Sequence, residues 1–230
     1  MLVIAHRGAS AYEPENTLRA IRRALEVGAD GIEIDVYCIE DELIVIHDET
    51  VDRTTNGHGL IRRHTVGELR ALDAGRGELI PFLSEALDLI DRRTLVNIEL
   101  KGPNTAGPVH ELLSRYICGC GWSAEDFLIS SFDGGELCRF AGLGVGKSAI
   151  PVGLLLTRAP EIGRALPAAL AGCSLHVPLA RVTESVVARA HANGQRLFVY
   201  TVNDQADMNR MARLGVDAIF TDYPDRRPAL

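Results

Sequence analysis

Two carboxylates separated by one residue, in the sequence Glu33-Ile34-Asp35, are the strongest chemical signal in this chain. They lie in an apolar segment that is typical of a β-strand, where residues two apart point to the same side. Carboxylates on the same side repel each other, and burial makes both charges costly. A divalent cation would remove that cost. The pair therefore indicates a metal site.

A third carboxylate, Glu99 in "NIELK", ends the next predicted barrel strand. Three oxygen ligands with open coordination positions suit Mg²⁺ or Ca²⁺. A second interpretation needs no metal, because the first two carboxylates could pair with Arg7 and Lys101 in a structural ion network. The position of Glu99 favours the metal, with Glu33, Asp35 and Glu99 as the predicted ligands.

Two histidines, His6 and His47, each follow a short apolar run and stand beside a charged neighbour. A histidine in this position is most often a buried, hydrogen-bonded side chain. Because imidazole titrates near neutral pH, however, two of them beside a metal can act as an acid–base pair. Arg7 and Lys101 add positive charge, which favours an anionic substrate and above all a phosphate.

Short apolar segments rich in branched residues alternate with helical patterns along the chain. The predicted strands are Leu2–His6, Gly31–Tyr37, Leu95–Leu100, Phe127–Ser131, Val152–Leu156, Ser174–Val177, Leu197–Val202 and Ala218–Thr221. The predicted helices are Asn16–Val27, Leu83–Asp91, Gly107–Ile117, Gly134–Ala141, Ala159–Leu170, Glu184–Ala192 and Asp204–Arg213. This alternation predicts an α/β fold of the (β/α)₈ TIM barrel type, with a doubly wound open sheet as the alternative.

The interval between the second and third predicted strands is much longer than the others. It contains a predicted hairpin from Tyr37 to Ile46 and then a polar, glycine-containing stretch. We expect residues of about 48–80 to form a small insertion between strands 2 and 3, above the barrel. The whole chain, residues 1–230, is predicted to be a single domain.

Active sites of such barrels lie at the carboxyl ends of the strands. Further polar residues end or follow predicted strands there, namely Ser130, Ser131, Asp133 and Asp222. We expect them to converge with the histidines and the carboxylates at one mouth. His176 lies on the sixth predicted strand and could face the interior, where substrate contact is the weaker interpretation.

Composition excludes several partners. The chain of 230 residues carries a net charge of −7 and has no basic run, which argues against nucleic acid. No apolar run approaches the roughly 20 residues that span a bilayer, so no stable membrane insertion is expected. The N-terminus lacks the pattern of a signal peptide, which predicts a cytoplasmic location. The five scattered cysteines argue against a disulfide framework.

Several motifs together resemble one known family. They are "HRG" (6–8), "PENT" (14–17), "EID" (33–35), "HD" (47–48), "RTTNG" (53–57), "NIELK" (97–101), "VYTVND" (199–204) and "GVDAIFTDYP" (215–224). In this order they resemble the glycerophosphodiester phosphodiesterases, a family of the phospholipase C-like phosphodiesterase barrel superfamily. The match covers nearly the whole chain, and the joint occurrence is specific although no single motif is.

The resemblance implies an enzyme of lipid and glycerol metabolism on a (β/α)₈ barrel with a small insertion after strand two. It implies metal-dependent hydrolysis of a small-molecule glycerophosphodiester to an alcohol and sn-glycerol 3-phosphate. By position, the acid–base pair would be His6 and His47, the metal ligands Glu33, Asp35 and Glu99, and the phosphate contacts Arg7 and Lys101. Two residues depart from the family pattern: Tyr200, where many members have tryptophan, and His58, where a small residue is common.

Other functions fit parts of this pattern. A related barrel could hydrolyse another phosphodiester or a phospholipid head group. A non-catalytic barrel could bind phosphate compounds, but it would be expected to lack a histidine or a metal carboxylate, and none is missing. The residues leave open whether water or a neighbouring substrate hydroxyl is the nucleophile, which histidine is the acid, which alcohol is released, and how many copies assemble.

Overall fold

A closed ring of parallel strands forms the centre of the molecule. The computed structural model describes residues 1–144, 149–157 and 166–228. The parallel strands in these ranges are β1 (Leu2–His6), β2 (Gly31–Ile39), β4 (Leu95–Leu100), β5 (Phe127–Ser131), β6 (Val152–Leu155), β7 (Ser174–Pro178), β8 (Leu197–Tyr200) and β9 (Ala218–Thr221). The ring closes because β1 pairs with both β2 and β9. The predicted (β/α)₈ barrel is confirmed, and the open doubly wound alternative is wrong.

Helices connect these strands on the outside of the ring. They are α1 (Leu18–Glu26), α3 (Leu83–Ile90), α4 (Ala106–Gly119), α5 (Gly134–Leu143), α6 (Glu184–Ala192) and α7 (Gln205–Leu214). Helix α1 begins two residues later than predicted, because Thr17 is extended and its hydroxyl accepts the N–H of Ala20 as an N-cap. Most of the helix predicted at Ala159–Leu170 lies outside the described residues, and its last three residues form the 3₁₀ helix η4 (Ala168–Leu170).

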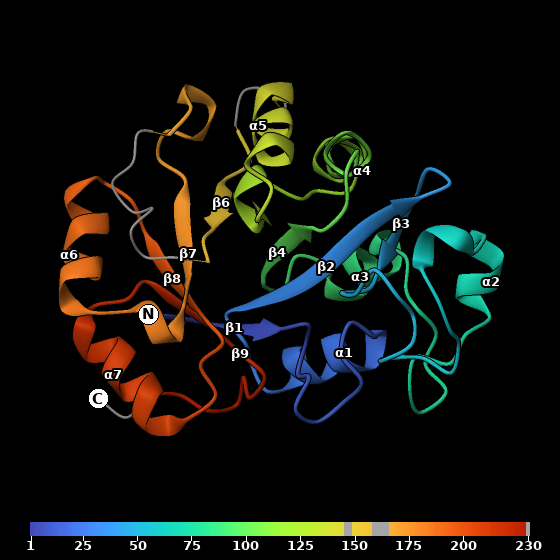
Figure 1. Ribbon diagram of the computed structural model, residues 1–230, viewed down its shortest axis with the longest axis horizontal. Coiled ribbons are helices and arrows are strands. Elements are labelled where there is room, and N and C mark those ends of the chain that lie inside the picture. The colour runs from blue at the N-terminus through green and yellow to red at the C-terminus, as the bar shows by residue number, and fades with distance from the viewer. Residues whose placement is uncertain (145–148, 158–165, 229–230) are drawn as a thin grey trace.

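The predicted hairpin is confirmed. Strand β2 extends beyond the ring and pairs antiparallel with β3 (Glu42–Val45), and the turn residues Glu40 and Asp41 both have positive φ. The following segment contains the 3₁₀ helix η1 (Ile61–Arg63) and the short helix α2 (Val66–Arg70). It packs on its own apolar cluster, made of Tyr37, Ile44, Ile46, Val51, Ile61, Leu69, Ala74 and Ile80. Figure 1 shows α2 at the edge of the molecule, beyond β3 and far from α6 and α7.

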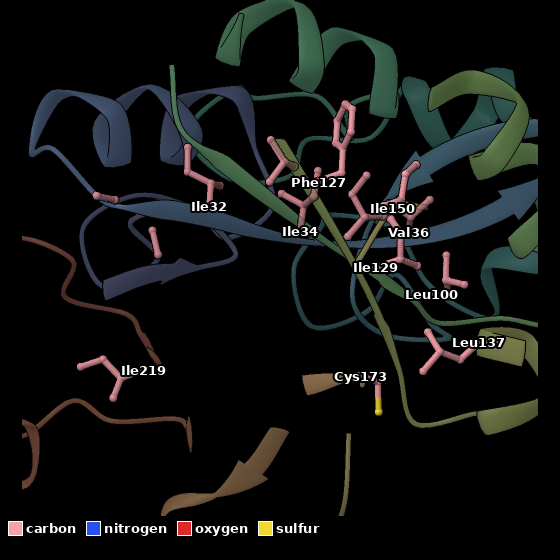
Figure 2. Close-up of a cluster of buried hydrophobic side chains, with 14 of the residues drawn as sticks. Ile32, Ile34, Val36, Leu100, Phe127, Ile129, Leu137, Ile150, Cys173 and Ile219 are labelled. Atoms are coloured by element: carbon pink, nitrogen blue, oxygen red, sulfur yellow. The ribbon is translucent and has the colours of Figure 1, made fainter. Parts of the chain in front are cut away.

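Alternation along β2 separates the apolar core from the chemistry. Ile32, Ile34 and Val36 point outward into the main core between strands and helices, where Figure 2 shows them near Phe127 and Ile129 of β5. The residues between them point into the ring. A smaller apolar cluster fills the ring interior and consists of Ile4, Leu128, Phe198, Ala218 and Phe220. The inner polar residues thus lie above an apolar plug.

Across residues 1–144, 149–157 and 166–228, no helix has both the length and the apolar character needed to cross a bilayer.

Candidate active site

Three buried carboxylates meet inside the ring. Glu33 and Asp35 lie on β2, and the register of β2 with β4 places Asp35 directly beside Glu99. One oxygen atom from each of the three lies within 4.8 Å of the others. Their exposed fractions are 3%, 1% and 8%. The structure therefore brings together the three residues that the sequence predicted as ligands.

The electrostatics of this cluster fit a cation. Burial, together with the charges of Asp35 and Glu99, raises the pKa of Glu33 well above its usual range. Burial and Asp35 likewise raise the pKa of Glu99. Within the described ranges, one oxygen of Glu33 and one of Asp35 are buried without a hydrogen-bond partner. Buried carboxylate oxygens are rarely left unpaired, and a divalent cation would satisfy them.

Two cations flank the same cluster. The Nζ atom of Lys101 lies 2.8 Å from Glu99 and 3.6 Å from Asp35. The Nε atom of Arg7 lies 3.3 Å from Asp35, and its backbone N–H donates to Glu33 at 2.8 Å. The ion network considered as an alternative is therefore present. It gives Asp35 Oδ1 a contact with Lys101 of 3.6 Å, longer than a hydrogen bond, and leaves Oε1 of Glu33 without a partner among the described residues. The network therefore leaves oxygens that a cation could bind.

Asn16 fixes the carboxylate of Asp35. Its amide Nδ2 donates to Asp35 Oδ2 at 2.9 Å, and its Oδ1 accepts the backbone N–H of Asp35 at 3.3 Å. Asn16 has φ of 57°, a left-handed conformation that asparagine adopts more readily than most residues. The "PENT" motif thus contains, in Asn16, a side chain that holds one predicted ligand in place.

His6 ends β1 and is held from the neighbouring strand end. Its Nδ1 lies 2.7 Å from Asp222, which follows β9. Burial alone would raise the pKa of Asp222, but hydrogen bonds from His6, Asn203 and Ser10 outweigh it and lower the pKa to about 2. An ionised carboxylate only accepts, so Nδ1 of His6 carries the proton and Nε2 is left for the cavity.

His47 follows β3 and is held in a different way. Its Nδ1 lies 2.5 Å from the carboxylate of the next residue, Asp48. Burial lowers the pKa of His47, although Asp35 and Asp48 oppose that shift. A hydrogen bond from Arg53 is the main cause that lowers the pKa of Asp48 to about 2. His47 therefore also keeps its proton on Nδ1.

Both histidines line one cavity of about 150 Å³ together with Arg7, Glu33 and Glu99. The other lining residues are Asn97, Ser130, Phe132, Leu155, His176, Tyr200, Thr201 and Phe220. The charged side of the cavity comes from β1, β2 and β4 and from His47 after β3, and the aromatic residues come from β7, β8 and β9 and from Phe132 after β5. Such a site accommodates a charged group beside an apolar one.

Not every predicted residue reaches this cavity. The hydroxyl of Ser131 turns away and donates to the carbonyl of Leu100. Asp133 accepts the N–H groups of Gly135 and Glu136 as the N-cap of α5, so its carboxylate is occupied by the helix. These two predictions of convergence are wrong, because alternate residues of a strand face opposite sides and a cap must point along its helix.

The roles of His176 and His58 could not be assigned from the sequence. His176 faces the interior but is fully buried, and its ring stacks on Phe198 with centroids 4.9 Å apart. Burial lowers the pKa of His176 to about 3, so it stays neutral. His58 is exposed on the insertion and lies 3.3 Å from Asp52. Its ring does not line the cavity.

Sequence reasoning did not assign the residues that hold the two histidines. Asp222 was expected only at the mouth, and its contact with His6 was not predicted. Glu15 and Arg53 form a bidentate ion pair, and the Nε of Arg53 also donates to Asp48. Their motifs, "PENT" and "RTTNG", were visible as part of the resemblance, but spacing alone does not say which charges meet.

The sequence itself is similar to known enzymes. The sequence model of the Glycerophosphoryl diester phosphodiesterase family matches residues 6–226. A Glycerophosphodiester phosphodiesterase of Caldanaerobacter subterraneus subsp. tengcongensis is 42% identical over 240 residues, which cover 97% of this chain and 95% of the relative.

Solved structures show the same similarity. A phosphodiesterase of Oleispira antarctica, in complex with the product sn-glycerol-3-phosphate, has a TM-score of 0.84 at 30% identity, over 98% of this chain and 94% of that one. A glycerophosphodiester phosphodiesterase of Agrobacterium tumefaciens has a TM-score of 0.79 at 30% identity, over 98% and 97% of the two chains. The similarity thus extends over the whole barrel.

Proposed function

The chain belongs to the glycerophosphoryl diester phosphodiesterase family, and from that premise we propose that it hydrolyses glycerophosphodiesters to sn-glycerol 3-phosphate and an alcohol. The proposal includes acid–base catalysis by His6 and His47 and dependence on a divalent cation. The observation that carries it is one cavity that holds both imidazoles, each fixed through Nδ1, beside three buried carboxylates.

The charged side of the cavity binds the phosphodiester. Arg7, which lines the cavity, and Lys101, which contacts the lining residue Glu99, offer N–H donors to the phosphate oxygens and offset the negative charge that builds on them. Burial opposes the charge of Lys101, but Glu99 and Asp35 raise its pKa, so it remains protonated. Glu33, Asp35 and Glu99 would hold the cation, Mg²⁺ or Ca²⁺, which supplies Lewis-acid charge at the phosphate.

The two histidines move the protons. One imidazole Nε2 takes the proton of the attacking hydroxyl while a new O–P bond forms. The other, protonated, gives its proton to the departing alkoxide while the old P–O bond breaks. The attacking hydroxyl is water or the neighbouring hydroxyl of the glycerol group. The second route leaves a cyclic phosphate that water then opens, and rapid quenching would detect that species.

The experiment is release of glycerol 3-phosphate from glycerophosphocholine and glycerophosphoethanolamine, measured with Mg²⁺, with Ca²⁺ and with EDTA. We expect release with a metal and none with EDTA, and the two substrates rank the head groups. Absence of release from folded protein with either metal would contradict the proposal and favour another phosphodiester or a binding role.

Three further predictions remain open to experiment. We propose that residues 1–230 act as one domain with residues of about 48–80 as its insertion. We also keep the predictions that nucleic acid is not a partner and that the protein is cytoplasmic. Size-exclusion chromatography with light scattering would measure the oligomeric state.

A further inference from the structure

A continuous set of ion pairs connects the phosphate-binding side of the cavity to His47 through the insertion. Arg7 Nη1 donates to Glu15 Oε1 at 2.7 Å. Arg53 donates from Nη1 and Nη2 to the two oxygens of Glu15 at 2.7 and 2.8 Å. The Nε of Arg53 donates to Asp48 Oδ2 at 2.6 Å, and the other oxygen of Asp48 lies against His47 Nδ1.

His47 needs such a connection because its carboxylate partner is its own neighbour in the chain. Asp48 belongs to the same loop, so a movement of that loop carries both side chains together. A carboxylate can fix an imidazole only if something outside the loop segment fixes the carboxylate. Arg53, five residues further along the chain, makes such a contact with Asp48 through its Nε–H.

The guanidinium of Arg53 is suited to this task. Its Nη atoms form a fork that grips both oxygens of Glu15, and its Nε remains to hold Asp48. Only arginine offers this planar set of donors, and a lysine ammonium cannot reproduce it. Glu15 is mostly buried, with a side-chain exposure of 19%, and Arg7 fixes it from the other side. The residue that holds Arg53 therefore lies outside the insertion, in the loop between β1 and α1.

We propose that Arg53 is a positioning residue for catalysis: braced by Glu15, it fixes Asp48 so that His47 keeps its proton on Nδ1 and presents Nε2 to the cavity. This inference rests on the proposed function, in which His47 transfers a proton. It gives the insertion a direct part in the chemistry. The side chain of Arg53 is 49% exposed, so the contact is formed at the surface and not in the core.

The opposing interpretation is that Arg53 merely tethers the insertion to the loop after β1. A matched ion pair makes the two interpretations separable. Arg76 of the insertion donates to Glu13 of the same loop at 2.6 Å, and its side chain is 57% exposed. It provides the same kind of tether, and within the described part of the chain it pairs with Glu13 and not with Asp48.

The first test compares kcat and KM of Arg53→Ala, Arg53→Lys and Arg76→Ala with those of the parent enzyme, on glycerophosphocholine. We expect Arg53→Ala to lower kcat about 10-fold, within the range known for partners of active-site ligands, with a much smaller change in KM. Arg53→Lys should recover part of that loss, and Arg76→Ala should retain the parent kcat. Equal losses in Arg53→Ala and Arg76→Ala, or a parent-like kcat in Arg53→Ala, would overturn the proposal.

The second test is a double-mutant cycle. If Arg53 acts through Asp48, then Arg53→Ala should lower kcat by less than roughly twofold when Asp48→Asn is already present. Persistence of the full loss in the Asp48→Asn background would show that Arg53 acts elsewhere, and the proposal would fail.

A third readout does not depend on turnover. Nitrogen-15 NMR of the imidazole rings, recorded in EDTA at neutral pH, reports which ring nitrogen carries the proton. Arg53→Ala should move His47 from the Nδ1–H form to a mixture and leave His6 unchanged. An unchanged His47 would contradict the inference. An enzyme that shows the expected NMR change but no hydrolysis would contradict the proposed function alone.

Discussion

The surroundings of His6 and His47 differ in what holds the carboxylate on Nδ1. Asp222, the partner of His6, is bound by the neutral donors Asn203 at 2.6 Å and Ser10 at 3.0 Å. Asp48, the partner of His47, is bound by the charged and half-exposed Arg53. Of two similar imidazole–carboxylate pairs, one is thus stabilised by neutral hydrogen-bond donors and the other by a charged side chain.

The difference follows from where each pair lies in the fold. His6 meets Asp222 because ring closure pairs β1 with β9, with Ala5 beside Thr221. Parallel pairing fixes both strand ends, so neutral hydrogen bonds are enough to hold Asp222 against His6. His47 follows β3, which lies outside the ring. Its partner Asp48 is therefore held by a charged contact from the insertion and not by the pairing of two ring strands. A surface contact of this kind is weaker and more sensitive to salt than a buried one.

The largest expected effect tests whether both pairs serve catalysis at all. His6→Ala and His47→Ala should each lower kcat at least about 10²-fold, because each removes a general acid or base. Kinetics with glycerophosphocholine measure the loss. Circular dichroism and thermal unfolding serve as controls for the fold, and parent-like turnover in either variant would remove that histidine from the mechanism.

A smaller effect tests whether the two pairs are independent. Asp222→Asn should lower kcat about 10- to 100-fold by loosening the tautomer of His6. Because Asp222 and Arg53 share no partner among the residues that the structure describes, adding Arg53→Ala should multiply that loss by its full factor. A combined loss that equals that of Asp222→Asn alone would show that the two histidines are held by one network.

The smallest effect concerns stability in acid. Both Asp48 and Asp222 have a pKa of about 2 in the folded protein, below the ordinary value of 3.8. A lowered carboxyl pKa stabilises the fold above about pH 4, and that contribution is lost as the pH falls toward 2. Asp222→Asn and Asp48→Asn should therefore each reduce the change in the free energy of unfolding between about pH 4 and pH 2.

Arg53→Ala separates the two carboxyl groups in that experiment. It should remove most of the contribution of Asp48, whose pKa is lowered mainly by Arg53 and also by His47, and leave the contribution of Asp222. Urea unfolding of the EDTA-treated protein between about pH 4 and pH 2 measures the contribution of each carboxyl group to the free energy of unfolding. A parent-like pH dependence in Arg53→Ala would show that Asp48 is held by other groups.

Much of the site was predictable from local sequence. The alternation in Glu33-Ile34-Asp35 places both carboxylates on one face, and the strand ending in Glu99 has the same polarity. The structure brings these three residues together. The expectation of Ser131 and Asp133 at the mouth was wrong. In the sequence, a serine whose hydroxyl points outward and an aspartate that caps a helix cannot be distinguished from residues of a site.

The sequence by itself determined the alternation of strands and helices, the hairpin, and the types of residue at the strand ends. These depend on periodicity and on neighbours a few residues apart. Only the tertiary structure decided which distant side chains meet: Asp222 with His6 across ring closure, and Glu15 with Arg53 across the insertion. Those contacts depend on strand register and loop path, which local sequence does not specify because many charged partners are available to each side chain.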